Sequence, residues 1–228
     1  MPGTLVLFVL VFISSLPVIA VFFWFKLSKY EFTIFCFLFA LLAGAASFFP
    51  ALLFQEILNM TFHSNRLNLF FHHFIRIAFT EELSRFLLLL IYFWINDRIL
   101  QRISGQYTRC NSIGINYEKK ATATGLIAGF GFALLENATY AASDINLLPL
   151  RIILTSAIHG ACGSRIGTAT FLIRSNPIKA ILNVIAATAI HGIYNLMVIM
   201  PGIAPIMAIL VAISALFTSI LTIRYSSS

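Results

Sequence analysis

Charged residues are scarce in this chain. Of its 228 residues, 15 are Lys or Arg and 8 are Asp or Glu, which together make 10% of the sequence, whereas soluble domains typically carry about 25%. Hydrophobic residues account for 60%, and the mean hydropathy is +0.94. Water is therefore not the main solvent of this chain. We predict a single membrane-embedded domain over residues 1–228, in contact with the lipid bilayer.

Cysteine patterns and basic stripes are also missing. The three cysteines, Cys36, Cys110 and Cys162, show no CxxC spacing, which gives no support for a disulfide framework or a thiolate zinc site. The net charge is +7, but the basic residues occur singly or in pairs beside apolar runs instead of forming a stripe with interleaved aromatics. Nucleic acid is therefore excluded as a partner.

Long apolar runs occupy most of the sequence. Matched against the length needed to cross a bilayer, they predict an all-α polytopic bundle of about seven transmembrane helices. The predicted spans are 4–25, 32–49, 69–96, 121–142, 149–173, 178–199 and 203–223. The stretch from Ala51 to Asn68 is interpreted either as an interfacial helix or as an ordinary loop. No internal repeat is evident.

The basic residues predict the orientation of these spans. Ten of the fifteen fall on one side if the first loop is cytoplasmic. They are Lys26, Lys29, Arg98, Arg102, Arg109, Lys119, Lys120, Arg174, Lys179 and Arg224. Because basic residues favour the cytoplasmic side, we predict the N-terminus outside and the C-terminus inside. As a separate expectation, the protein is integral to the plasma (inner) membrane of a prokaryote.

Ionisable and polar side chains occur inside four of the predicted spans, where a charge costs about 2.5–3.5 kcal/mol at mid-bilayer. They are Glu81, Glu82, Arg85, Glu136, His159, Arg165, His191 and Asn195. With a rise of about 1.5 Å per residue from the outer end, Glu136, His191, His159 and Glu81 come out about 9, 12, 13 and 18 Å deep. We therefore expect four helices to present these groups to one cavity in the outer half. Six glycines in the fourth and fifth spans would let the helix backbones approach closely.

The acidic pair in the third span can be interpreted in two ways. Glu82 and Glu81 lie at i, i+3 and i, i+4 to Arg85, so either carboxylate can take the arginine. A neutralised pair of buried charges is commonly structural. The carboxylate that remains free suits a general base or acid. We assign Glu81 as the base and Glu82 with Arg85 as its orienting pair.

The remaining groups form a set of potential metal ligands. His159, His191 and Glu136 make a His₂Glu set, which with an open position for water is a known arrangement of catalytic zinc. Zn²⁺ is thus the candidate cofactor, and a metal-free glutamate mechanism is the alternative. Asn195 shares a helix face with His191 and either stabilises an oxyanion or orients the imidazole.

Four motifs in separate spans resemble the PrsW family of intramembrane proteases, which is grouped with the CAAX prenyl-proteases and the Abi proteins. The motifs are Glu81-Glu82-Leu83-Ser84-Arg85, Phe132-Ala133-Leu134-Leu135-Glu136, an isolated His159, and His191-Gly192-Ile193-Tyr194-Asn195. The chain departs from the PrsW pattern by having Arg85 in place of lysine and Asn195 in place of aspartate. The resemblance implies a protease-like core over about 69–200 that hydrolyses peptide bonds of membrane-anchored substrates.

Two other functions use the same residues. A cation or proton transporter also buries glutamates and histidines, but transporters often show repeats or interrupted helices, and no repeat relates the halves of this chain. A non-catalytic membrane scaffold would keep the fold and tolerate loss of Glu81. The presence of Glu81, Glu136, His159 and His191 together argues against a scaffold.

Overall fold

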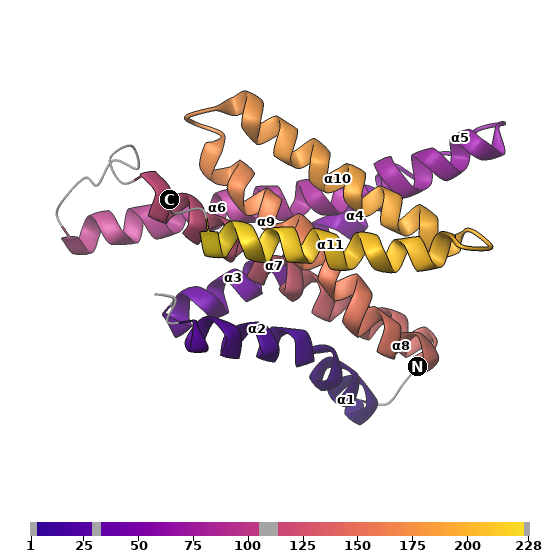
Figure 1. Cartoon of the computed structure of the whole chain (residues 1–228), viewed down its shortest axis with the longest axis horizontal. Helices are drawn as coiled ribbons and strands as arrows, with labels where there is room; N and C mark the ends of the chain where they lie inside the picture. The colour runs from indigo at the N-terminus through magenta and orange to yellow at the C-terminus, as the bar shows by residue number, and fades with distance from the viewer. Residues whose placement is uncertain (1–3, 29–32, 105–113, 226–228) are drawn as a thin grey trace.

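The computed structural model describes residues 4–28, 33–104 and 114–225, and over these residues the chain forms helices and no strand. Most of the long helices lie along one common direction (Figure 1), and the start of α1 and the end of α11 lie at opposite ends of the bundle. This placement agrees with an odd number of crossings. Which end faces the cytoplasm stays a prediction, and Lys29 and Arg109, two of the residues behind it, lie outside the described residues.

The helices follow one another with short connections. Their bounds are α1 Thr4–Ser14, α2 Leu16–Leu27, α3 Ile34–Ala46, α4 Phe48–Ile57, α5 Asn65–Phe70, the π-helix η1 Phe71–Phe79, α6 Thr80–Ser104, α7 Gly114–Ser143, the 3₁₀ turn η2 Ile145–Leu147, α8 Leu148–Leu150, the π-helix η3 Arg151–Thr155, α9 Ser156–Leu172, α10 Pro177–Ile199 and α11 Ala204–Tyr225. All seven predicted spans coincide with helical segments.

Five helical stretches among the described residues are long and apolar enough to cross a membrane. They are Phe8–Leu27, Ile34–Ile57, Ile145–Leu172, Pro177–Ile199 and Ala204–Tyr225. The two remaining predicted spans belong to α6 and α7, which carry polar residues of the candidate site and are less apolar. The structure therefore supports a polytopic membrane protein, while the count of seven spans stays a prediction.

The prediction that the second span ends at residue 49 was wrong. After a break at Ser47, whose hydroxyl donates to the carbonyl of Gly44 at 2.6 Å, α4 continues the same candidate span to Ile57. A proline breaks or kinks a helix when it lies in the interior of that helix. Pro50 falls in the first turn of α4, where its missing N–H costs no hydrogen bond.

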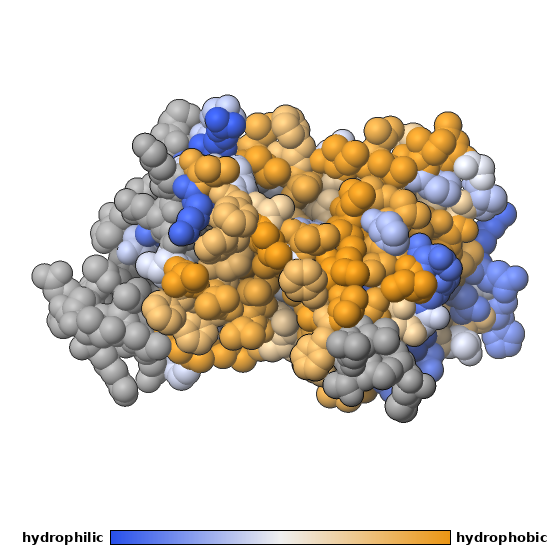
Figure 2. All heavy atoms as spheres, turned by 90° about the horizontal axis from the view of Figure 1, so that it is seen from below, coloured by the Kyte–Doolittle hydropathy of each residue, from blue (hydrophilic) through white to orange (hydrophobic). Residues whose placement is uncertain are grey.

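The surface of the bundle is largely apolar. Seen from below the view of Figure 1, hydrophobic residues cover the middle of the molecule, and hydrophilic residues gather toward its ends (Figure 2). Large side chains on α1 are also exposed, with Phe8 70% and Phe12 68% exposed. Exposure of this kind suits a hydrocarbon solvent and would be a liability in water.

Close contact between α7 and α9 holds the centre of the bundle together. A Cβ atom at Gly129 would overlap the backbone carbonyl oxygen of His159, and one at Gly163 would overlap that of Gly125. Glycine therefore allows the two helix backbones to touch, as the sequence predicted. The contact fixes the height of His159 relative to α7.

We expect Gly129→Ala to destabilise the protein by about 1–3 kcal/mol, the usual cost of overpacking. The added methyl meets rigid backbone, so α9 and His159 must move. Gly160→Ala is the matched control, because its methyl would meet the Phe130 ring at 2.7 Å, and a side chain can turn aside. Thermal unfolding in detergent measures both variants, and an equal loss in the two would contradict the backbone explanation.

Candidate functional site

The buried ion pair that the sequence left open forms between Glu82 and Arg85. Arg85 Nη1 donates to Glu82 Oε2 at 2.5 Å, and both side chains are completely buried. Glu82 also accepts a hydrogen bond at Oε1 from His191 Nδ1 at 2.9 Å. Glu82 is thus occupied on both oxygens, and Glu81 is the carboxylate left without the arginine.

The tautomer of His191 follows from this contact. A carboxylate accepts hydrogen bonds, so Nδ1 of His191 carries a proton and Nε2 presents a lone pair. A histidine held by a carboxylate at one nitrogen is the usual arrangement of a metal ligand. His191 Nε2 faces Glu81 Oε2 at 3.7 Å. These two atoms are the most available ligand atoms of the site.

His159 has the opposite tautomer to His191. Arg85 Nη2 lies 3.1 Å from its Nδ1, and a guanidinium has only donors, so Nδ1 accepts. Its Nε2 then carries the proton and donates to Glu136 Oε2 at 2.8 Å. To bind a metal ion at Nε2, His159 must lose that proton or release Arg85 so that the proton can move to Nδ1.

Glu81 divides its two oxygens between different tasks. Gln55 Nε2 donates to Oε1 at 3.0 Å. Oε2 is buried and has no hydrogen-bond partner among the described residues. An orphaned buried carboxylate oxygen is rare in native proteins, because desolvation without a partner is costly. It is the strongest indication in the structure that something cationic or protic binds here.

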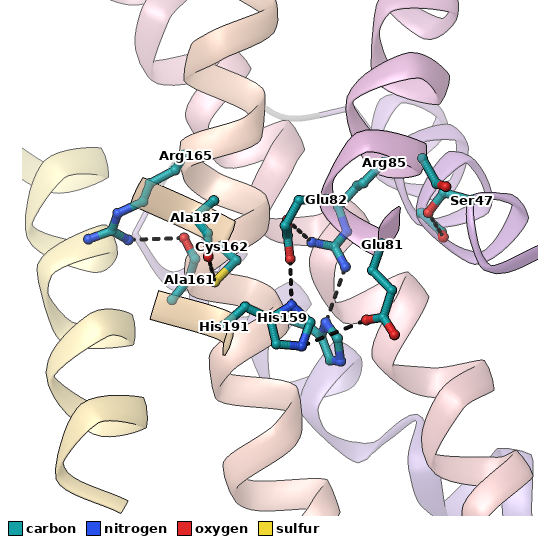
Figure 3. Close-up of polar contacts among 12 residues, drawn as sticks. Ser47, Glu81, Glu82, Arg85, His159, Ala161, Cys162, Arg165, Ala187 and His191 are labelled. Carbon is teal, nitrogen blue, oxygen red and sulfur yellow. Dashed lines mark hydrogen bonds and ion pairs between the residues drawn. The ribbon is translucent and has the colours of Figure 1, made fainter. Parts of the chain in front are cut away.

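Glu81, His159 and His191 form the only group of three or more potential metal ligands in the part of the chain that the structure describes. Each offers one ligand atom within 4.8 Å of the others, and all three are buried. The two histidine rings lie edge to face with centroids 4.8 Å apart, and Glu81 points toward them (Figure 3). The nitrogen and oxygen donors fit a divalent ion such as zinc.

This group differs by one carboxylate from the predicted set of Glu136, His159 and His191. Glu136 lies beside the group, but its Oε2 already contacts His159 Nε2 and Arg151 Nη2, each at 2.8 Å. Glu81 has the free oxygen instead. The position of Arg85, which pairs with Glu82, explains the difference, because it leaves Glu81 uncompensated.

A cavity of about 300 Å³ reaches the group from one side. Its lining residues are Phe48, Ala51, Leu52, Gln55, Glu81, Phe132, Glu136, Thr139, Tyr140 and Ser143. From Phe132 to Ser143 it follows α7 over eleven residue-to-residue steps, about 16 Å at the helical rise. Glu81 and Glu136 contribute carboxylates to the lining, and the residues contributed by α4 are mostly apolar.

Two residues named from the sequence stand apart from this network. Asn195 is half-buried one turn after His191, and no hydrogen bond to the other six predicted site residues is found for it within the described ranges. Arg165 donates to the carbonyl of Ala161 at 3.1 Å and lies 3.3 Å from Ser219 Oγ, so it joins α9 to α11. Figure 3 shows Arg165 on the far side of α9 from Glu81.

Sequence reasoning missed two participants. Gln55 was assigned to a loop or interfacial helix, although a polar residue within an apolar run is a signal in itself. Arg151 was not singled out, because it stands close to the start of the predicted span 149–173. It pairs with Glu136 and stacks over Tyr140 with its guanidinium carbon 3.7 Å from the ring centroid.

We expect Arg85→Met to destabilise the protein by about 3–5 kcal/mol, because Glu82 would be left as a buried charge without a cation. Arg165→Met is the control, since within the described residues Arg165 hydrogen-bonds only neutral oxygens. Thermal or denaturant unfolding in micelles measures both. If Arg165→Met costs as much as Arg85→Met, the Glu82 pairing is not the cause.

A helical membrane bundle with a buried cluster of histidines and carboxylates beside a cavity has the features of an intramembrane metal-dependent hydrolase. The comparisons agree with this class. A family model described as PrsW family intramembrane metalloprotease matches residues 33–221. The chain belongs to this family, and the match extends on both sides of the predicted core at 69–200. No matching protein was found among curated proteins or among solved structures.

Proposed function

We propose that this protein is an intramembrane endopeptidase that hydrolyses peptide bonds of membrane-anchored proteins with the help of a zinc ion. The observation that carries the proposal is the buried group of Glu81, His159 and His191, which come from three helices and offer ligand atoms within 4.8 Å of one another. Family membership supports the class of reaction. The wider grouping with CAAX prenyl-proteases and Abi proteins stays a prediction.

Glu81 Oε2, His191 Nε2 and His159 would hold the metal ion. Bound there, zinc would acidify a water molecule and polarise the scissile carbonyl. Glu82 keeps His191 in the tautomer that presents Nε2, and Arg85 holds Glu82 in place. This arrangement gives Glu81 a ligand role in place of the base that its sequence context suggested.

Glu136 is then the carboxylate that handles protons. It lines the cavity, and Arg151 at 2.8 Å keeps it oriented without occupying both of its oxygens. A carboxylate so placed can take a proton from the attacking water and return it to the leaving amine, which is worth about 10²–10⁴-fold in rate. For Asn195 both roles considered from the sequence stay open, stabilising the oxyanion or orienting the imidazole of His191.

The cavity suggests how a substrate is held. Phe48, Leu52 and Phe132 make an apolar wall beside the two carboxylates. An extended segment of a single-span protein would place apolar side chains against this wall and its peptide bond near Glu136. Burial of those side chains supplies binding energy at about 25 cal/mol per Å² of apolar surface.

The proposal is tested with purified protein in proteoliposomes that contain a library of single-span reporters. We expect cleavage that falls when a chelator is added and returns with zinc. Chelator-resistant cleavage would support a metal-free glutamate mechanism instead. Cation flux in the same liposomes without cleavage of any reporter would contradict the protease and favour the transporter.

A further inference from the structure

Gln55 lies outside the four sequence motifs and touches the candidate metal group. Its side-chain amide donates to Glu81 Oε1 at 3.0 Å, and the residue lines the cavity. Among the described residues this is the only hydrogen bond given to Glu81, since Oε2 has none. The orientation of the Glu81 carboxylate therefore depends on a residue of α4.

The backbone of Gln55 is itself anchored. Arg76, in the π-helix η1, donates through Nε to the carbonyl oxygen of Gln55 at 2.8 Å. The last carbonyl groups of a helix lack partners within the helix, and a cation at that end is favourable. Arg76 thus fixes the end of α4 at a defined height beside the start of α6, where Glu81 lies.

A carboxylate rotates about its terminal bond, and one fixed oxygen determines where the other points. With Oε1 bound to Gln55, Oε2 is directed toward His191 Nε2, 3.7 Å away. Partners of this kind, which hold a ligand without touching the metal, typically change metal affinity by about 10–100-fold when they are removed.

We propose that Gln55 is a positioning residue that aims Glu81 Oε2 at the metal, with Arg76 fixing Gln55 in turn. The inference rests on the proposed metal site. It makes α4 part of the metal centre as well as a wall of the substrate cavity. The side-chain amide of Gln55 therefore connects the metal centre with the substrate cavity.

The experiment measures metal binding without any substrate. Cobalt(II) replaces zinc as the probe, and its visible absorption reports both the dissociation constant and the ligand set. Gln55→Met removes the donor and keeps the length of the side chain. Gln55→Asn keeps the amide but draws it back by one methylene, beyond reach of Glu81. Glu56→Gln is the matched control, because Glu56 is the adjacent, exposed residue of α4.

We expect Gln55→Met and Gln55→Asn to raise the cobalt dissociation constant about 10–100-fold and to alter the absorption band, while Glu56→Gln changes neither. A role in folding alone would lower the thermal unfolding temperature of the metal-free protein and leave the dissociation constant within twofold. That result in either folded Gln55 variant overturns the inference and leaves the metal site intact. A wild-type protein that takes up no cobalt overturns both.

Discussion

Glu81→Gln is expected to abolish cleavage. It should also weaken metal binding more than any substitution of a residue, such as Gln55, that holds a ligand without touching the metal. The amide keeps the size of the side chain and removes the anionic oxygen that faces His191 at 3.7 Å. Losing a direct ligand should cost more than the about 100-fold that losing a supporting contact can cost. Cobalt titration gives the affinity, and reporter cleavage in proteoliposomes gives the activity.

The outcome separates two roles for Glu81. Loss of both cobalt binding and cleavage supports the ligand role. Retained cobalt affinity with lost cleavage would return Glu81 to the role of base, which the sequence suggested, and would leave Glu136 as the ligand. Undiminished cleavage would contradict both assignments. A folded state is confirmed by comparing the thermal unfolding of the variant with that of the metal-free wild type.

Glu136→Gln is expected to lower cleavage by about 10²–10⁴-fold while cobalt binds with nearly unchanged affinity. An amide cannot take a proton from water, but its oxygen can still accept a hydrogen bond from His159 and contact Arg151. The ligand atoms of Glu81 and His191 are not touched by the change. Single-turnover cleavage of one reporter, with the cobalt dissociation constant measured on the same preparation, tests both halves of the prediction.

The control for Glu136→Gln is a substitution of Arg151, which forms an ion pair with Glu136. Arg151→Lys keeps a cation near Glu136 but loses the planar contact with Tyr140, so we expect a smaller fall in cleavage than for Glu136→Gln. If Glu136→Gln loses cobalt as well as activity, Glu136 is a ligand and the predicted set of Glu136, His159 and His191 gains support. Full activity would exclude it as the proton carrier.

Much of the site was accessible from the sequence because intramembrane polar residues are conspicuous. Glu81, Glu82, Arg85, Glu136, His159 and His191 were selected by their cost in lipid, and the structure brings these six into one buried network. The depth estimates anticipated a shared position in the bundle. The catalytic roles of these residues and of Asn195 stay predictions.

The pairing within the network was beyond the sequence. Spacing allows Arg85 to reach either Glu81 or Glu82, and the choice depends on where His159 and His191 lie. Gln55 was missed because the second span was predicted to end at residue 49. Helix packing brings it to Glu81, across 26 positions of sequence. Long-range contacts of this kind leave no local pattern.

By itself the sequence determined the class of solvent, the helical fold and the set of polar residues, because hydropathy and spacing are local properties that a bilayer enforces on every segment. The tertiary structure decided which oxygen of Glu81 stays free, which nitrogen of each histidine carries a proton and which side of the group a cavity reaches. Those features depend on distances between helices, which the contact of α7 with α9 through glycine sets at atomic scale.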